Sequence, residues 1–336
     1  MRIKRNMING ICLTLILSVA ARFLAQYLPN LGAEAIAMLL GIIVGNTIFT
    51  GSKWSAGVKW AEKYPIEIGI ALMGLTVTLR TIASLRIQGV IFIVLQMTAT
   101  ILFVMWIGQR LIKVPSKSAM LMASGNAVCG SSAIASVAPA IGANDDQRRT
   151  AVATVSLSGV VLLFALPVLG PVLFGQQNLL ISALIGGTVQ SVGQVVGTAA
   201  LVNPTVVTFA TLFKMLRVIL LSVVVFVFAR IAAKKDQGQG EEETAVRAVK
   251  KVSVPWFVMT FIVFVLINSF LSLPNFVNDS AKTVSSFFGV VNLAGIGLNL
   301  KWQTIKASGQ KYLAYGLLTL IFQALCAILL IQLLLA

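Results

Sequence analysis

Apolar runs long enough to cross a bilayer recur from one end of this 336-residue chain to the other. About 20 apolar residues in a helix match the hydrocarbon thickness of a membrane. Of its residues, 58% are apolar and only 11% are charged. The sequence therefore predicts an all-α polytopic membrane protein.

Hydropathy predicts eleven spans that are separated by short polar gaps. They cover residues 7–28, 35–50, 65–80, 89–112, 117–141, 150–174, 179–201, 206–230, 255–273, 281–300 and 312–335. We treat residues 1–336 as a single transmembrane domain. The hydrophilic segment 232–254, with its EEETAVRAVKK run, is predicted to be a cytoplasmic linker within it.

The net charge of +16 is distributed over the gaps between the apolar runs. With a cytoplasmic N-terminus, most of the 26 Lys and Arg residues fall on the cytoplasmic side of the predicted spans. Cytoplasmic loops of membrane proteins are enriched in these residues. We therefore expect a multi-pass protein of the cell membrane with its N-terminus inside. Its partner is the lipid bilayer, and we expect no nucleic acid partner.

The fifth predicted span is interrupted midway by small and polar residues. These are Gly125, Asn126, Cys129, Gly130, Ser131 and Ser132. A spanning helix tolerates such a break only where protein or a water-filled cavity satisfies the freed backbone groups. Ser131 and Ser132 are predicted to cap a second half-helix, whose unpaired N–H groups favour an anion. The segment is thus a candidate substrate site, and the alternative is a glycine-rich packing surface.

The seventh predicted span carries a second candidate break in LIGGTVQSVGQVVGTAAL. Gly186 and Gly187 are the expected helix breakers. Gln190, Ser191 and Gln194 would then form a polar stripe at membrane depth. Amide groups donate hydrogen bonds to an anion, and they also join helices to one another. Both interpretations remain open at this stage.

Two cations, Lys214 and Arg217, lie inside the eighth predicted span. A charge at the bilayer centre costs at least ~2.5 kcal/mol, so each requires a specific partner. The two residues are three apart and share one helical face. They are candidate ligands for an anion. The alternative is that they donate to carbonyl groups of the broken helices and hold the helices together.

The positions of the acidic residues and the absence of histidine indicate whether the substrate carries a negative or a positive charge. The chain has no histidine, and none of its ten Asp and Glu residues lies near the middle of a predicted span. Glu67 comes closest, in a first helical turn after Pro65. Transporters of cations or protons normally keep a carboxylate or histidine at depth. The sequence therefore favours an anion as substrate.

Enzymatic chemistry finds no support in the sequence. We find no clustered metal ligands, no nucleophile with an evident base beside it, and no phosphate-binding P-loop. Cys129 has no candidate base. We therefore expect no enzymatic activity, no metal and no cofactor.

An internal similarity suggests inverted repeats. Gly74–Arg80 reads GLTVTLR and Gly295–Lys301 reads GIGLNLK. The two heptamers run in opposite directions across the membrane, as an inverted repeat requires. Dividing spans two to eleven into halves instead pairs the tenth span with the fifth. The pairing of the repeats therefore stays open.

Several motifs together resemble one known family. They are GNAVCGSSAIASVAPAIGA, GGTVQSVGQVVGTAA, FKMLRVILL, PWFVMTFIVFVLINSF and LAGIGLNL. In this order they are similar to motifs of the YeiH family, bacterial membrane proteins also described as sulfate exporters. The resemblance implies a transporter of ten or eleven helices with broken helices that cross at mid-membrane, as in the superfamily of cation:proton antiporters and anion transporters. It places Gly125 to Ser132 on the central motif and Lys214 and Arg217 on the KMLR motif.

One departure from the family concerns coupling. Members often have a His-Glu pair where this chain has Gln190 and Ser191. If that pair carries protons in other members, proton coupling at this position is not expected here.

The sequence thus predicts a secondary transporter, in the exporting direction, for a small anion such as sulfate, sulfite or a sulfonate. Alternating access would occur around the broken-helix site. The alternatives are a cation:proton antiporter and a sodium-coupled organic anion symporter. A homodimer is one assembly compatible with this class.

Overall fold

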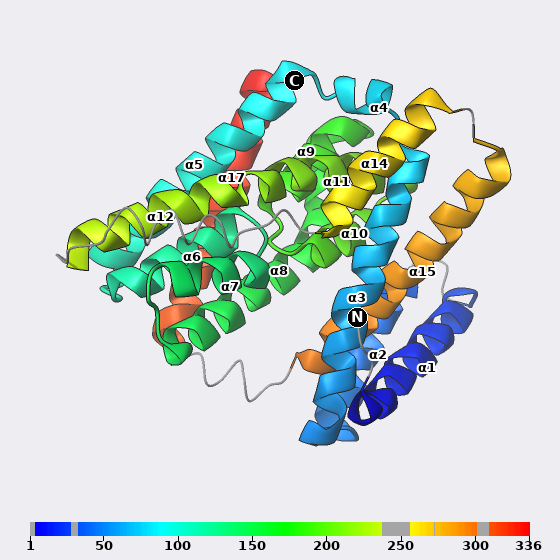
Figure 1. Ribbon diagram of the computed structural model, residues 1–336, viewed down its shortest axis with the longest axis horizontal. Coiled ribbons are helices and arrows are strands. Elements are labelled where there is room, and N and C mark those ends of the chain that lie inside the picture. The colour runs from blue at the N-terminus through cyan, green and yellow to red at the C-terminus, as the bar shows by residue number, and fades with distance from the viewer. Residues whose placement is uncertain (1–3, 28–32, 237–255, 272, 301–308) are drawn as a thin grey trace. The chain divides into compact units, whose positions relative to one another are not determined.

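The computed structural model describes residues 4–27, 33–236, 256–271, 273–300 and 309–336. Over these ranges the chain forms helices and no strand, which confirms the all-α prediction. Figure 1 labels the main helices. In chain order the elements are η1 Arg5–Met7, α1 Ile8–Ala25, α2 Ala33–Thr47, η2 Ser52–Trp54, α3 Ser55–Met73, η3 Gly74–Thr76, α4 Leu79–Ala83, α5 Arg86–Arg110, α6 Ser116–Ala127, α7 Ser131–Ala140, α8 Asp145–Phe174, α9 Asn178–Thr188, α10 Val192–Ala200, α11 Pro204–Ile219, α12 Leu221–Asp236, α14 Trp256–Phe270, α15 Asn275–Asn299 and α17 Gly309–Leu334.

In the described part of the chain, six helical segments are long and apolar enough to cross a membrane. They are Arg5–Ala25, Arg86–Arg110, Asp145–Phe174, Pro204–Ala232, Asn275–Asn299 and Gly309–Leu334. The shorter helices α2, α9 and α14 are apolar as well. These helices fit a multi-pass membrane protein, while the number of eleven spans stays a prediction. The part of the predicted linker from 237 to 254 lies outside the described residues.

The third predicted span is misplaced. Residues 65–80 were expected to be helical throughout, but α3 covers Ser55–Met73, and Val77 and Thr78 are extended. Charged residues near 60 lower the local hydropathy, although the apolar face of the same segment is buried. Glu62 therefore lies near the middle of α3, which is not among the helices of the described residues that are long and apolar enough to cross a membrane.

The described helices group into two compact units. The first unit comprises Met1–Ser84, Ala199–Pro204 and Pro255–Thr304. The second unit comprises Leu85–Thr198, Thr205–Val254 and Ile305–Ala336. The first predicted broken segment, residues 179–198 of the second and residues 205–219 of α11 belong to the second unit.

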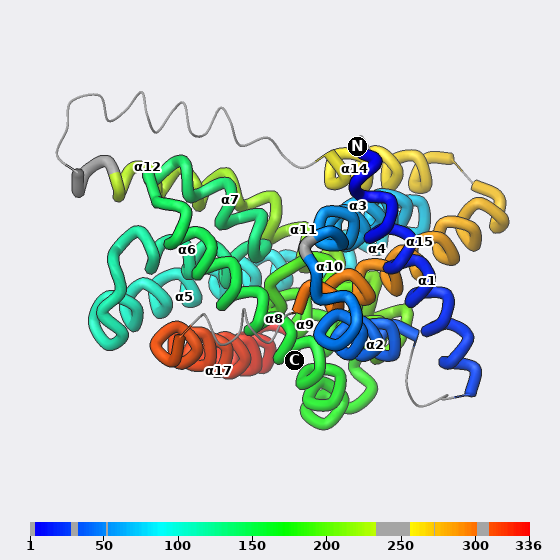
Figure 2. Tube along the Cα trace, turned by 90° about the horizontal axis from the view of Figure 1, so that it is seen from below, coloured from blue at the N-terminus to red at the C-terminus, as the bar shows by residue number. Residues whose placement is uncertain are grey.

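In the first unit, α15 packs against α1, α2 and α3, which Figure 2 draws in blue around the orange helix. Small residues allow this close approach, as at many membrane-helix interfaces. A Cβ atom added to Gly41 would lie 2.6 Å from the carbonyl oxygen of Ala294, and one on Gly45 would lie 2.8 Å from that of Leu298. Gly297 meets Gly41 from the opposite side. The backbones of α2 and α15 are therefore in direct contact.

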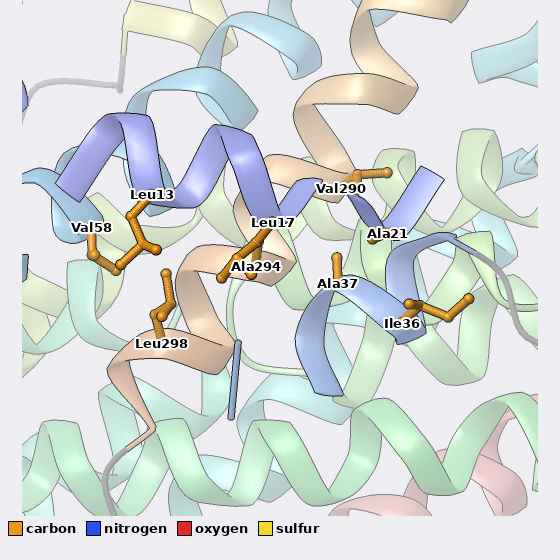
Figure 3. Packing of buried hydrophobic residues seen from close by; sticks show 9 residues of the cluster. All are labelled: Leu13, Leu17, Ala21, Ile36, Ala37, Val58, Val290, Ala294 and Leu298. Atoms are coloured by element: carbon orange, nitrogen blue, oxygen red, sulfur yellow. The ribbon is translucent and has the colours of Figure 1, made fainter. Parts of the chain in front are cut away.

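An apolar cluster continues this packing between the same four helices, as Figure 3 shows. Its members are Leu13, Leu17, Ala21, Ile36, Ala37, Val58, Val290, Ala294 and Leu298. All nine are buried. The cluster and the glycine contacts together fix α15 against its neighbours.

In the second unit, α17 packs antiparallel to α5. The Tyr315 hydroxyl donates to the Val104 carbonyl at 2.6 Å, and Gln96 Nε2 donates to the Gln323 carbonyl at 2.9 Å. Between these bonds the faces of both helices are buried. This packing carries the Gln323 side chain toward the first helix break.

The α2–α15 contact yields a stability prediction. Gly297→Ala should lower the free energy of unfolding by about 1–3 kcal/mol, because its Cβ has no room beside the backbone of α2. Thermal unfolding in detergent measures the effect. Gly51→Ala is the control, since its nearest atom lies 4.0 Å away. Equal melting temperatures for the two variants would contradict the packing account.

Candidate functional site

The predicted break in the fifth span is present. α6 ends at Ala127 and α7 begins at Ser131. Gly130 between them has φ of 69° and ψ of −129°, a conformation that residues with a Cβ rarely adopt. Its N–H donates to the Gly125 carbonyl at 2.9 Å. Gly125 itself packs on Ile134, where a Cβ would lie 2.8 Å from a side-chain carbon.

The predicted caps of α7 are wrong. Gly130 occupies the N-cap position, and no side chain accepts a hydrogen bond there. Ser131 and Ser132 are instead the first two helical residues, and both are exposed. The reason is the glycine turn, which brings the chain into the helix one residue earlier than expected. α7 therefore starts with its first-turn N–H groups beside two exposed hydroxyl-bearing residues.

The seventh span is broken as well, but not where the glycines predicted. α9 continues to Thr188, and α10 begins at Val192. Gly186 and Gly187 lie inside α9, where they allow close packing. A Cβ on Gly186 would lie 2.6 Å from the Ala210 carbonyl oxygen. The break thus lies at residues 189–191.

Ser191 and Gln194 form a reciprocal cap at the start of α10. Ser191 Oγ accepts from the Gln194 N–H at 3.1 Å, and Gln194 Oε1 accepts from the Ser191 N–H at 3.2 Å. This is the S-x-x-Q capping box. Gln194 Nε2 also donates to the Ser156 carbonyl at 3.2 Å. Gln194 is therefore chiefly a structural residue.

The two breaks meet each other. A Cβ placed on Gly130 would lie 3.7 Å from atoms of both Gln190 and Ser191. The N-terminal ends of α7 and α10 therefore lie next to each other in space. Two helix N-termini, which carry partial positive charge, begin at the same place.

Lys214 donates to three backbone carbonyls of the two breaks. Its Nζ lies 2.5 Å from the Val128 oxygen and 2.9 Å from the Val189 oxygen, and it also contacts the Gln190 oxygen. The side chain is 0% exposed. An ammonium group has three donors, and all three are used.

Arg217, one turn further along α11, binds the carbonyls just before the same breaks. Nε donates to the Ala127 oxygen at 2.8 Å, and one terminal nitrogen donates to the Asn126 oxygen at 2.6 Å. The other terminal nitrogen reaches the Gly186 and Val189 oxygens at 3.0 and 3.1 Å. Four of the five guanidinium N–H groups are therefore engaged.

These carbonyls are the C-terminal ends of α6 and α9. Such ends carry unpaired acceptors and partial negative charge, and a buried cation there is stabilising by up to ~2 kcal/mol. Lys214 and Arg217 therefore cap both half-helices. This geometry supports the structural interpretation of the two cations. A direct bond from Lys214 to a substrate would require one of its three carbonyl bonds to break.

A network of buried amides extends from Asn126. Gln190 Nε2 donates to Asn126 Oδ1 and to Gln323 Oε1, at 3.1 Å in both cases. Gln323 Nε2 donates to the Asn126 carbonyl at 3.0 Å, the oxygen that Arg217 also binds. The prediction that Gln190 joins the broken-helix region is consistent with these bonds. Gln190 here connects helices, which was the second interpretation of the amide stripe.

Gln323 and Gln96 were not among the predicted site residues. Each is an amide in the middle of an otherwise apolar span, in LIFQALC and VLQMTA. Both are 0% exposed, and the Gln96–Gln323 bond joins α5 to α17. The signal in the sequence that could have identified them is an uncharged polar residue in the middle of an apolar span.

Cys129 lies in the first break and is a free, buried thiol. Within the described ranges no group of His, Cys, Asp or Glu residues has the arrangement of a metal site.

Comparison with known proteins places the chain in one family of membrane proteins. A family model described as "Conserved hypothetical protein 698" matches residues 9–316. A UPF0324 membrane protein of Lactiplantibacillus plantarum is 42% identical over 332 residues, which cover 98% of both chains. The UPF0324 inner membrane protein YeiH of Escherichia coli K12 is 31% identical over 291 residues, covering 85% of this chain and 81% of YeiH. No solved structure matches.

The fold and the two breaks define an all-α polytopic membrane protein with paired, interrupted helices. The chain belongs to the UPF0324 family, which includes YeiH. The resemblance seen in the sequence motifs is thereby confirmed.

The capping role of the cations leads to a stability prediction. Lys214→Met should leave the buried carbonyls of Val128 and Gln190 without their side-chain donor, while the Val189 oxygen keeps its bond from Arg217, and each unsatisfied buried acceptor costs about 1–3 kcal/mol. We expect a melting temperature well below wild type in detergent, and a similar loss for Arg217→Met.

Lys282→Met provides the control. Lys282 is an exposed cation in a surface ion pair with Asp279, so its loss should hardly change the melting temperature. Wild-type stability in Lys214→Met would show that the carbonyl contacts do not hold the breaks.

Proposed function

We propose that this protein is a secondary transporter of a small anion, with sulfate, sulfite or a sulfonate as first candidates and export as the expected direction. The proposal includes no chemical conversion of the substrate. The observation that carries it is the meeting of two helix N-termini at the breaks.

The backbone at these N-termini is suited to an anion. α7 begins without a side-chain cap, and Ser131 and Ser132 add hydroxyl donors next to its first-turn N–H groups. Helix N-termini bind oxyanions through such N–H groups and through the helix dipole. A tetrahedral oxyanion offers only acceptors, so it matches a site made of donors.

The distribution of charged residues in the second unit also favours an anionic substrate. Among its described residues, Lys214 and Arg217 are the buried charged side chains. Asp145 and Asp146 lie exposed in the first turn of α8. The two cations are bound to carbonyls, so we assign them a positioning role and a long-range contribution to anion attraction. No buried carboxylate in the described part of this unit opposes an anion.

The same distribution disfavours the alternative of a cation:proton antiporter at this site. A cation would approach two helix N-termini and two buried positive charges. A sodium-coupled organic anion symporter keeps the anion site but requires a separate cation site.

The test uses a charge placed at the start of α7. Ser131→Asp puts a carboxylate where an anion would bind, yet an acidic residue in a first helical turn favours the helix itself. At ~4 Å and an effective dielectric constant of ~20, two like charges repel by ~4 kcal/mol. We therefore expect uptake of radiolabelled sulfate or sulfite into proteoliposomes to fall at least about tenfold.

Ser131→Asn is the matched control, because it has nearly the same size and no charge. It should transport at close to the wild-type rate, and both variants should melt like wild type. Equal uptake by the Asp and Asn variants would exclude the start of α7 as the anion site.

A further inference from the structure

The first interrupted segment, α6–α7, reverses its direction at the break. Nζ of Lys117 in α6 donates to the carbonyl oxygen of Gly142, just beyond α7, at 3.4 Å. These residues are 25 positions apart, and a helix that continued in one direction would separate them by ~37 Å. Closer to the break, Gly125 of α6 packs on Ile134 of α7. α6 and α7 are therefore antiparallel neighbours, and Figure 2 shows them side by side.

The second interrupted segment, α9–α10, also turns back. Ser182 Oγ in α9 donates to the carbonyl oxygen of Val206 in α11 at 3.3 Å. The two residues are 24 positions apart, which would correspond to ~36 Å along one continuous helix. One turn further on, a Cβ on Gly186 would lie 2.6 Å from the Ala210 oxygen. α9 and α11 therefore run parallel, and α10 between them runs in the opposite direction.

The ends of α8 show from which sides the two segments enter. This helix of 30 residues is long and apolar enough to cross the membrane. Gly142, which Lys117 contacts, lies just before Asn144, the N-cap of α8. At the other end, a Cβ on Gly170 would lie 2.9 Å from the side chain of Ile181, near the start of α9. α6 and α9 therefore begin at opposite ends of a spanning helix.

Both breaks lie beside the middle of α8. A Cβ on Gly125 would lie 3.0 Å from the side chain of Val155, and Gln194 Nε2 donates to the Ser156 carbonyl at 3.2 Å. The helices α6, α7, α9 and α10 have 12, 10, 11 and 9 residues, which makes each ~14–18 Å long. This is about half of the ~30 Å hydrocarbon core. Each helix is thus long enough to reach the middle of the membrane and no further.

We propose that α6–α7 and α9–α10 are two re-entrant hairpins that enter the membrane from opposite sides and meet at their tips, where Gly130 lies beside Gln190 and Ser191. In this arrangement the fifth and seventh predicted spans do not cross the bilayer. Two crossings are removed together, so the segments that follow keep their predicted sides. The loops before and after α8 exchange sides relative to the eleven-span prediction.

The positions of the positive charges agree with this exchange. Alternating crossings would place Arg148 and Arg149 outside. The hairpins place both at the same end as Lys117, whereas residues 175–177 and 201–203 at the other end include no Lys or Arg. Cytoplasmic loops are enriched in these residues. The α6–α7 hairpin therefore enters from the cytoplasm, and the α9–α10 hairpin enters from outside.

The consequence for the anion site rests on the proposed function. The exposed residues of α7 are small or polar, namely Ser131, Ser132, Ala135 and Pro139. α8 instead exposes large apolar side chains such as Val161, as a helix that faces lipid does. The exposed face of α7 is therefore an aqueous path from the cytoplasm to the start of this helix. An exported anion arrives from that side.

The sidedness of four loops tests the hairpins without any transport assay. The variant with Cys12→Ser and Cys326→Ser sets the background, because its remaining Cys129 is buried. Single cysteines are then placed at exposed positions near the ends of the hairpins. They are Gln109→Cys, Asp146→Cys, Gln176→Cys and Thr205→Cys.

A membrane-impermeant maleimide is applied to intact cells and to inside-out vesicles. We expect Asp146→Cys to be labelled from the cytoplasmic side together with Gln109→Cys, and Gln176→Cys from the outside together with Thr205→Cys. Labelling of Asp146→Cys and Gln109→Cys from different sides would overturn the α6–α7 hairpin. Labelling of Gln176→Cys and Thr205→Cys from different sides would overturn the α9–α10 hairpin.

The path along α7 is tested with Ala135→Cys, one turn from Ser131, in the same background. A sulfonate-bearing methanethiosulfonate reagent should modify it in inside-out vesicles. Val161→Cys is the control, because it is exposed at a similar depth on α8 and should not react. Sulfate should slow the modification of Ala135→Cys at least about threefold, because a bound anion covers its site.

Each outcome of this experiment decides a different point. An unreactive Ala135→Cys would overturn the aqueous path. Rapid modification that sulfate does not slow would leave the path in place and contradict the proposed anion site. If wild type moves no anion at all, the proposed function fails, and the maleimide labelling still decides the hairpins.

Discussion

The second unit depends on one constraint: carbonyl groups released by two helix breaks must find donors inside an apolar protein. Water and lipid do not reach residues 126–128 and 186–190, which are buried. Lys214 and Arg217 supply seven hydrogen bonds to these segments. Burying the two charges is costly, and the cost is offset by the hydrogen bonds that these carbonyls gain, although the Asn126 oxygen also accepts one from Gln323. The breaks and the cations therefore require each other.

This arrangement separates the two polarities of the broken helices. The negative C-terminal ends of α6 and α9 are neutralised by side chains of α11. The positive N-terminal ends of α7 and α10 begin at the same point, and α7 has no side-chain cap. A fixed set of donors that requires no rearrangement is favourable for anion binding, since the entropy of ordering is already lost. The amides of Gln190 and Gln323 hold the breaks in register.

The sequence reveals the first break because Gly130 and its polar neighbours interrupt an apolar run. It misplaces the second break, because Gly186 and Gly187 look like helix breakers but serve close packing with α11 and α5. A glycine can either break its own helix or let a second helix approach closely. Which of the two occurs depends on the helix packed against it, and a single sequence does not show that helix. The sequence could not identify the hydrogen-bond partners of Lys214 and Arg217 either, because these partners lie on other helices. The third span was misplaced because hydropathy averages over α3, a helix whose two faces differ.

The central claim is that Lys214 and Arg217 hold helix ends and do not contact the substrate. A high-resolution electron cryomicroscopy structure of the protein in lipid nanodiscs with sulfate tests it most directly. The account predicts sulfate beside the first turns of α7 and α10, with the lysine and arginine still bound to the carbonyls of residues 126–128 and 186–190. Sulfate within hydrogen-bond distance of Lys214 Nζ, with those carbonyls released, would contradict it.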